Sequence, residues 1–119
     1  MHFRQLTIIV EKLEESIEFY ESVTELAISR RIKEGTAEVV FLTNGNGETE
    51  IELVHTPQMQ KFEGKGFSVC FETEDLDGKH EFVQSKGLNP SDIRNPNAES
   101  RYFYVYDPNG ISIQIRQKF

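Results

Sequence analysis

The chain has 119 residues, a length at which a protein builds one hydrophobic core rather than several independent ones. Its 37% of hydrophobic residues and its four prolines are typical of a globular protein, which excludes a disordered or fibrous one. The net charge of −7, without a dense cluster of lysine and arginine, excludes nucleic acid as the expected partner.

The first half of the chain predicts the element order βαβββ. Residues 3–10 alternate between apolar and polar side chains, as a strand with one wet face does. Residues 13–23 carry an apolar stripe at helical spacing among acidic residues. Three segments rich in β-branched and apolar residues follow, separated by turns that contain glycine, and are predicted as strands: residues 26–34, 36–43 and 50–55.

The second half predicts the same order of elements. Residues 66–73 are expected to form a strand, and residues 75–86 a helix that ends at Gly87. Residues 101–106 and 111–117 are predicted as the last two strands. The turn-rich segment before them leaves room for one short strand, at residues 92–94.

The two halves also resemble each other residue by residue. The segment EKLEESIEFY, which begins at Glu11, aligns with EDLDGKHEFV, which begins at Glu74, an offset of 63 (74 − 11). Near the end of each half EIELVH matches SIQIRQ, which places Glu52 over Gln114. Because only two copies exist, the prediction is one α+β domain over residues 1–119, made of tandem modules at about 1–60 and 61–119.

Two segments resemble the vicinal oxygen chelate superfamily, which includes glyoxalase I, bleomycin-resistance proteins and extradiol dioxygenases. They are LEESIEFYESV, from Leu13, and YVYDPNGISIQI, from Tyr104, and the resemblance spans nearly the whole chain. It implies that the βαβββ modules form a curved, half-barrel-like mixed sheet with the helices outside. One departure is Glu25, since relatives usually have glycine after the first helix.

The resemblance also implies a pocket in which four side chains, two from each module, hold a metal in metal-using members. In this chain those four positions are occupied by Gln5, Glu52, Phe67 and Gln114. The spacing agrees with this mapping, since 67 − 5 and 114 − 52 both equal 62. The expected pocket would therefore be lined by these residues.

These four residues predict no metal and no other cofactor. Phe67 has no ligand atom, and one carboxylate with two amides suits a divalent first-row metal poorly. The three histidines do not compensate, because His2 is near the terminus, His80 is on a helix and His55 points away from Glu52.

The aromatic residues of the strand at 101–106 favour binding of a small molecule. Tyr102, Tyr104 and Tyr106 share one face of that strand, and rings with hydroxyl groups suit a planar or apolar ligand. Tyr104 is also where the resemblance implies a ligand-contacting tyrosine. Tyr102 and Tyr106 could instead be part of the core, and the sequence leaves that alternative open.

Glu52 is the only member of the four that could move a proton, so a second interpretation is catalytic. The chain is expected to be a metal-independent small-molecule-binding protein of the bleomycin-resistance type. The alternative is a glyoxalase-like lyase, or an isomerase with Glu52 as general base. Glu52 could equally only accept hydrogen bonds from Gln5 and Gln114.

Three further expectations concern surroundings and surface. No stretch is apolar enough for a signal peptide or a membrane span, so the cytoplasm is the expected location, and a homodimer is implied by the resemblance. Cys70, which lacks a disulfide partner, is expected to be a small buried residue. Arg30 and Arg31 are adjacent on a strand, so one of them is expected at the rim of the pocket.

Overall fold

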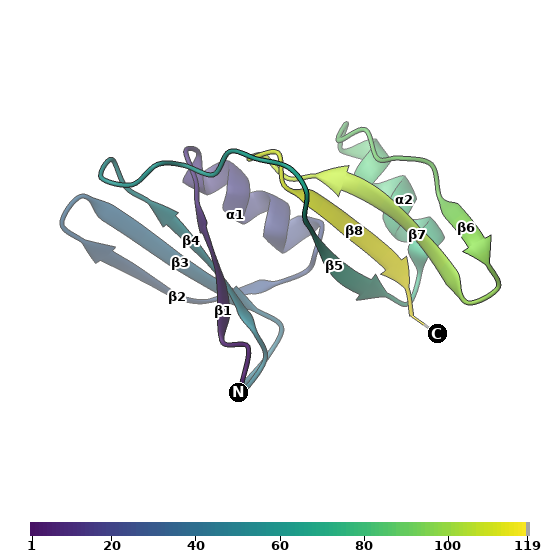
Figure 1. Cartoon of the computed structure of the whole chain (residues 1–119), viewed down its shortest axis with the longest axis horizontal. Helices are drawn as coiled ribbons and strands as arrows, with labels where there is room; N and C mark the ends of the chain where they lie inside the picture. Colours follow the sequence, from purple (N-terminus) through teal and green to yellow (C-terminus); the bar gives the residue numbers. More distant parts are fainter. Residues whose placement is uncertain (119) are drawn as a thin grey trace. The chain divides into compact units, whose positions relative to one another are not determined.

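The computed structural model describes residues 1–118, which form two compact units, Met1–Glu63 and a second one that begins at Gly64. Within the described residues each unit has one helix and four strands in the order βαβββ, which confirms the predicted duplication (Figure 1). In the same residues neither helix is long and apolar enough to cross a membrane.

The first unit is a four-stranded mixed sheet with one helix. Its elements are β1 (Gln5–Ile9), α1 (Leu13–Ser22), β2 (Ala27–Glu34), β3 (Ala37–Thr43) and β4 (Glu50–His55). The strand order is β1-β4-β3-β2, with β1 parallel to β4 and the other neighbours antiparallel (Figure 1). The strand β4 is therefore flanked on both sides, and its side chains meet those of β1 and β3.

The core of the first unit lies between α1 and one face of this sheet. The buried residues come from α1 at helical spacing and from alternate positions of the strands: Leu13, Ile17, Tyr20, Ile8, Val40, Leu42, Ile51 and Leu53. Because successive strand residues point to opposite faces, Gln5, Thr7 and Glu52 lie on the face away from α1.

The second unit repeats this arrangement. Its elements are β5 (Ser68–Thr73), α2 (Leu76–Ser85), β6 (Arg94–Asn97), β7 (Ser100–Tyr106) and β8 (Ser112–Gln117), in the strand order β5-β8-β7-β6. The core lies under α2 and consists of Leu76, Val83, Phe103, Val105, Ile113 and Ile115. The ring of His80, on α2, meets the ring of Phe103 edge-on at 4.9 Å, so this histidine is structural.

The short strand of the second unit begins later than predicted, at Arg94 rather than residue 92. Ser91 is held beside β7 instead: its N–H donates to the Tyr104 carbonyl at 2.8 Å and its Oγ accepts from the Tyr104 N–H at 2.9 Å. The strand itself contains Pro96, which cannot donate to a ladder and is tolerated because β6 is at the edge of the sheet.

The two helices end in the same backbone conformation with different residues. Glu25 follows α1 with φ of 61°, and Gly87 follows α2 with φ of 75°. In both cases the next N–H donates back to the helix, from Leu26 to Tyr20 and from Leu88 to Val83. Glu25 thus occupies a left-handed conformation that favours glycine, the residue the resemblance predicts there.

Candidate functional site

On the first unit, Glu52 is held by two donors from β1. Gln5 Nε2 donates to Glu52 Oε1 at 3.0 Å, and Thr7 Oγ1 donates to the same oxygen at 2.6 Å. The other oxygen, Oε2, accepts no hydrogen bond from residues 1–118 and is not buried. The carboxylate is therefore fixed in orientation with one oxygen open to a ligand. The sequence offered a hydrogen bond from Gln5 to Glu52 as one alternative and did not point to Thr7, although alternation places Thr7 on the same face.

The next strand covers the other side of Glu52 with an aromatic ring. Phe41 on β3 is the register partner of Glu52, and Arg30 on β2 is the register partner of Phe41. The Arg30 guanidinium carbon lies 3.9 Å from the centroid of the Phe41 ring, a cation–π contact. Arg30, not Arg31, therefore reaches this face, because Arg31 pairs with Glu14 and Glu38 instead.

The second unit presents a row of tyrosines on the equivalent face. Phe103 and Val105 are buried under α2, so Tyr102, Tyr104 and Tyr106 point to the opposite face, as predicted. Tyr106 is 67% exposed and Tyr102 is half-buried, so neither belongs to the core of this unit. Three hydroxyl-bearing rings are thus displayed on one surface.

Tyr104 is the centre of this row and has partners on both neighbouring strands. Gln114 Nε2 on β8 donates to the Tyr104 hydroxyl at 3.3 Å. The Tyr102 ring stands edge-on to the Tyr104 ring with 5.6 Å between centroids, and the Arg94 guanidinium carbon lies 5.8 Å from the Tyr104 centroid. In each unit, then, an arginine from the outer strand lies over an aromatic residue of the next strand. That aromatic residue pairs in turn with Glu52 in the first unit and with Gln114 in the second.

Phe67 does not occupy the position inferred from the spacing. It precedes β5 and is 47% exposed. The pairing of Gln5 with Glu50 in the first unit corresponds to that of Ser68 with Ser112 in the second, so Ser68 is the residue equivalent to Gln5. Equivalent residues of the two units are therefore 63 positions apart in their first strands (68 − 5) and 62 positions apart in their last strands (114 − 52). The difference arises because the turn before β8 is one residue shorter than the turn before β4.

Comparison with known proteins gives the family. A model described as Glyoxalase/Bleomycin resistance protein/Dioxygenase superfamily matches residues 2–115. The chain belongs to this superfamily. No curated protein sequence matches it.

Solved structures of the glyoxalase and bleomycin-resistance type share the fold. TnmS3, an antibiotic binding protein from a Streptomyces species, has a TM-score of 0.80 at 19% identity, over 100% of this chain and 97% of its own. A glyoxalase I variant from Zea mays has a TM-score of 0.86 at 20% identity, over 98% of this chain and 45% of its own. A trypanothione-dependent glyoxalase I from Leishmania major has a TM-score of 0.80 at 19% identity, over 98% of this chain and 86% of its own.

For a member of this superfamily, the donor set around Glu52 does not fit a divalent first-row metal. Both neighbours of Glu52 donate hydrogen to it, so a single carboxylate oxygen is open, and first-row metals prefer several imidazole, thiolate or carboxylate ligands. Among residues 1–118 no three His, Cys, Asp or Glu side chains are grouped for metal binding. His55 contacts the Val10 carbonyl through Nδ1, and His80 the Ser91 carbonyl through Nε2.

Cys70 is exposed, which corrects the expectation of a buried residue. It lies on the tyrosine-bearing face of the second unit, because its register partner is Gln114. The equivalent residue of the first unit is Thr7, whose partner is Glu52. Partial burial raises the pKa of the Cys70 thiol, more than the nearby Arg116 lowers it, which favours the protonated thiol at neutral pH.

Proposed function

We propose that this superfamily member binds a small, partly aromatic molecule and does so without a divalent metal. The observation that carries the proposal is the row Tyr102, Tyr104 and Tyr106, which points away from the core of the second unit and whose central member, Tyr104, is contacted by Gln114 and Arg94. Amphipathic rings of this kind bury large apolar areas of a ligand while their hydroxyls supply directional hydrogen bonds.

A second support is the shared fold with TnmS3, which is an antibiotic binding protein. At 19% identity this likeness concerns the fold, so we use it only to choose the class of ligand to be tested first: planar aromatic natural products. The expected cytoplasmic location and the homodimer implied by the resemblance are part of the same proposal. Light scattering of the purified chain at several concentrations would test the second.

Tyrosine fluorescence offers a direct assay, because the chain has no tryptophan and four tyrosines, three of which are in this row. The fourth, Tyr20, is fully buried in the first unit. A planar aromatic ligand is expected to quench the emission with saturation, and the Tyr104→Leu variant should lose most of this response while remaining folded. Full retention of the response in Tyr104→Leu would contradict the proposal.

Metal independence is tested by calorimetry with nickel, zinc, cobalt and manganese. We expect no stoichiometric tight binding, because Glu52 has one open oxygen and two neighbours that donate hydrogen. Tight binding that disappears in Glu52→Gln would overturn this part of the proposal. The Glu48→Gln variant, in the turn before β4, makes the same charge change and is the matched control.

The alternative activity, a lyase or isomerase, is favoured by one observation. Glu52 has one oxygen fixed by Gln5 and Thr7 and the other free, which is the arrangement that a general base needs to take a proton next to a carbonyl. If a substrate is found, Glu52→Gln is expected to lower turnover by about 10²-fold or more. Unchanged turnover in this variant would exclude the catalytic role.

A further inference from the structure

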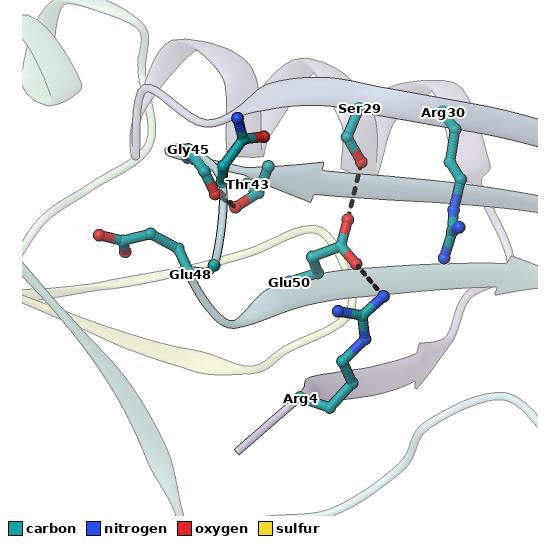
Figure 2. A pocket seen from close by; sticks show the side chains of 9 residues that line it. Arg4, Ser29, Arg30, Thr43, Gly45, Glu48 and Glu50 are labelled. Carbon is teal, nitrogen blue, oxygen red and sulfur yellow. Dashed lines mark hydrogen bonds and ion pairs between the residues drawn. The ribbon is translucent and has the colours of Figure 1, made fainter. Parts of the chain in front are cut away.

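A second feature of the first unit is a cavity of about 230 Å³ beside the end of β4 (Figure 2). The cavity is lined by two arginines, two acids, two hydroxyl residues and the rest of the glycine-containing turn between β3 and β4: Arg4, Arg30, Glu48, Glu50, Ser29, Thr43 and residues 45–47. Glu50 points to the same sheet face as Glu52, since the two are two positions apart on β4. The cavity therefore opens on the face that carries the candidate site.

The carboxylate of Glu50 is largely satisfied within the protein. Its side chain is only 12% exposed, and Ser29 Oγ donates to Oε2 at 2.8 Å. Arg4 Nη2 lies 3.7 Å from Oε1, an ion pair too long for a hydrogen bond, and the Arg4 side chain is 64% exposed (Figure 2). Arg4 is thus close to the Glu50 carboxylate without a hydrogen bond to it, so its N–H groups are available to a ligand.

Arg30 has no acidic partner at all among residues 1–118. Its only interaction is the stacking on Phe41, which occupies the flat face of the guanidinium and leaves the N–H groups at its edge free. In Figure 2 the Arg30 and Arg4 side chains extend to the space beside Glu50, whereas Glu48 points away from both. Of the two acids in the lining, Glu50 is engaged by Ser29 and Arg4, and neither Glu48 nor Glu50 forms an ion pair with Arg30.

We infer that this cavity binds the carboxylate of a small organic acid, or of one acidic arm of a larger ligand, between Arg4 and Arg30. A guanidinium fork matches a carboxylate in two parallel hydrogen bonds. The volume is below the roughly 300–1,000 Å³ typical of drug-sized ligands, so a small acidic group fits. This ligand class rests on the proposed function, because it adds an acidic group to the small molecules that the protein is proposed to bind.

The experiment uses benzoate as the probe and benzamide as its uncharged counterpart, with the whole ¹⁵N-labelled chain observed by NMR. Benzoate is expected to shift the side-chain Nε–H signals of Arg4 and Arg30 and the amide signals of Gly45 and Gly47 with saturation, and benzamide to leave them in place. Arg30→Gln should weaken benzoate binding about tenfold or more. Arg30→Lys keeps the positive charge but loses the paired N–H donors of the guanidinium, so its affinity for benzoate should lie between those of the parent chain and Arg30→Gln.

The matched control is Arg31→Gln, which makes the same charge change on the next residue of β2. Arg31 is engaged by Glu38, with 2.7 Å from its Nε to Oε2, and lies on the other face of the sheet. Benzoate affinity should stay within about twofold of the parent chain in this variant, because nonspecific charge effects on a surface residue are small.

Equal affinity for benzoate and benzamide, equal losses in Arg30→Gln and Arg31→Gln, or no shift at Arg4 and Arg30 would each overturn the inference. Tighter binding of inorganic phosphate than of benzoate at the same signals would also overturn the carboxylate assignment. The two proposals fail separately. If aromatic ligands quench the fluorescence through Tyr104 but benzoate does not bind, the proposed function stands and the carboxylate site does not. If benzoate binds at Arg4 and Arg30 but no aromatic ligand quenches the fluorescence, the carboxylate site stands and the proposed function does not.

Discussion

The two units share a fold and differ in what they display on the face away from the helix. At the central position of the last strand the first unit has Glu52, a charge held by Gln5 and Thr7, whereas the second has Gln114, a neutral amide bonded to Tyr104. Around these positions the first unit adds arginines and a cavity, and the second adds tyrosines. Duplication has thus produced one ionic and one aromatic surface from the same backbone pattern.

The units also differ in the depth of their cores. Helix α1 buries five residues, among them Phe19 and Tyr20, whereas α2 buries only Leu76 and Val83. The outer strand β2 has eight residues and β6 has four. Because burial of apolar area is the main stabilising term, the second unit depends more heavily on each of its few buried side chains.

The largest expected effect is therefore in the second unit, at Phe103. The side chain is fully buried beside His80, so Phe103→Ala should lower the free energy of unfolding by about 3–5 kcal/mol, measured by urea denaturation. Tyr102→Ala, one position away and on the other face, should cost below about 1 kcal/mol. A larger loss in Tyr102→Ala than in Phe103→Ala would mean that the faces of β7 are assigned the wrong way round.

The next effect concerns the turns that precede the last strands. Asp107 is buried, and its Oδ1 accepts from the N–H groups of Asn109 and Ile111, both at 2.8 Å. Asp107→Ala should cost about 1–3 kcal/mol because the Ile111 N–H would be left buried without an acceptor. In the first unit, on an exposed turn, Thr43 Oγ1 donates to the Gly45 carbonyl at 3.1 Å and accepts from the Gly45 N–H at 3.3 Å.

Thr43→Val is accordingly expected to cost below about 1 kcal/mol in the same denaturation experiment. A larger loss for Thr43→Val than for Asp107→Ala would show that burial does not separate the two turns.

A smaller effect is expected at the helix ends. Gly87→Ala should cost about 1 kcal/mol, because alanine at a φ of 75° is strained. Glu25→Gly should raise the melting temperature slightly, because it removes the strain at a φ of 61°. The rise is small because glycine also increases the conformational entropy of the unfolded chain. A fall in melting temperature for Glu25→Gly would mean that contacts of the Glu25 side chain outweigh the strain.

The smallest effect is electrostatic. A hydrogen bond from Arg101, at 3.1 Å between Nη2 and Oδ1, lowers the pKa of Asp77 from its ordinary 3.8. The pair therefore stabilises the fold above the unfolded pKa, and this contribution is lost as pH falls from about 4 through the lowered folded value. Arg101→Gln should return the pKa of Asp77 to its ordinary range in a carboxyl NMR titration. Lys61→Gln should act in the same way on Glu11, in the first unit.

The element order and the sheet faces could be predicted from the sequence because they depend on local periodicity. The alternation of side chains along β7 placed its tyrosines on the face opposite Phe103. The similar spacing of residues in the two halves placed Gln5 and Glu52 in the same group of residues, and the two lie on neighbouring strands. What failed depended on strand register. A one-residue difference in turn length moved the Gln5 equivalent from Phe67 to Ser68, and a bulge between Ile28 and Arg30 decides which arginine faces Phe41.

The two cation–π contacts could not be predicted for the same reason. Arg30 over Phe41 and Arg94 over Tyr104 join neighbouring strands whose pairing is set by turns and bulges, not by composition. The cavity at Glu50 likewise depends on how the segments of Arg4, Ser29 and the turn at 45–48 meet. Register, rather than residue type, is the information that the structure adds.

The outer strand β2 has a consequence for self-association. All eight of its residues are exposed, three of them are Arg30, Arg31 and Lys33, and the bulge interrupts its ladder. Charged side chains on an edge strand and a bulge both discourage a second copy from adding its own strand to this edge. If two copies of the chain pair, we therefore expect them to join through a surface other than the open edge of β2, and we do not expect this edge to support the successive addition of strands from further copies.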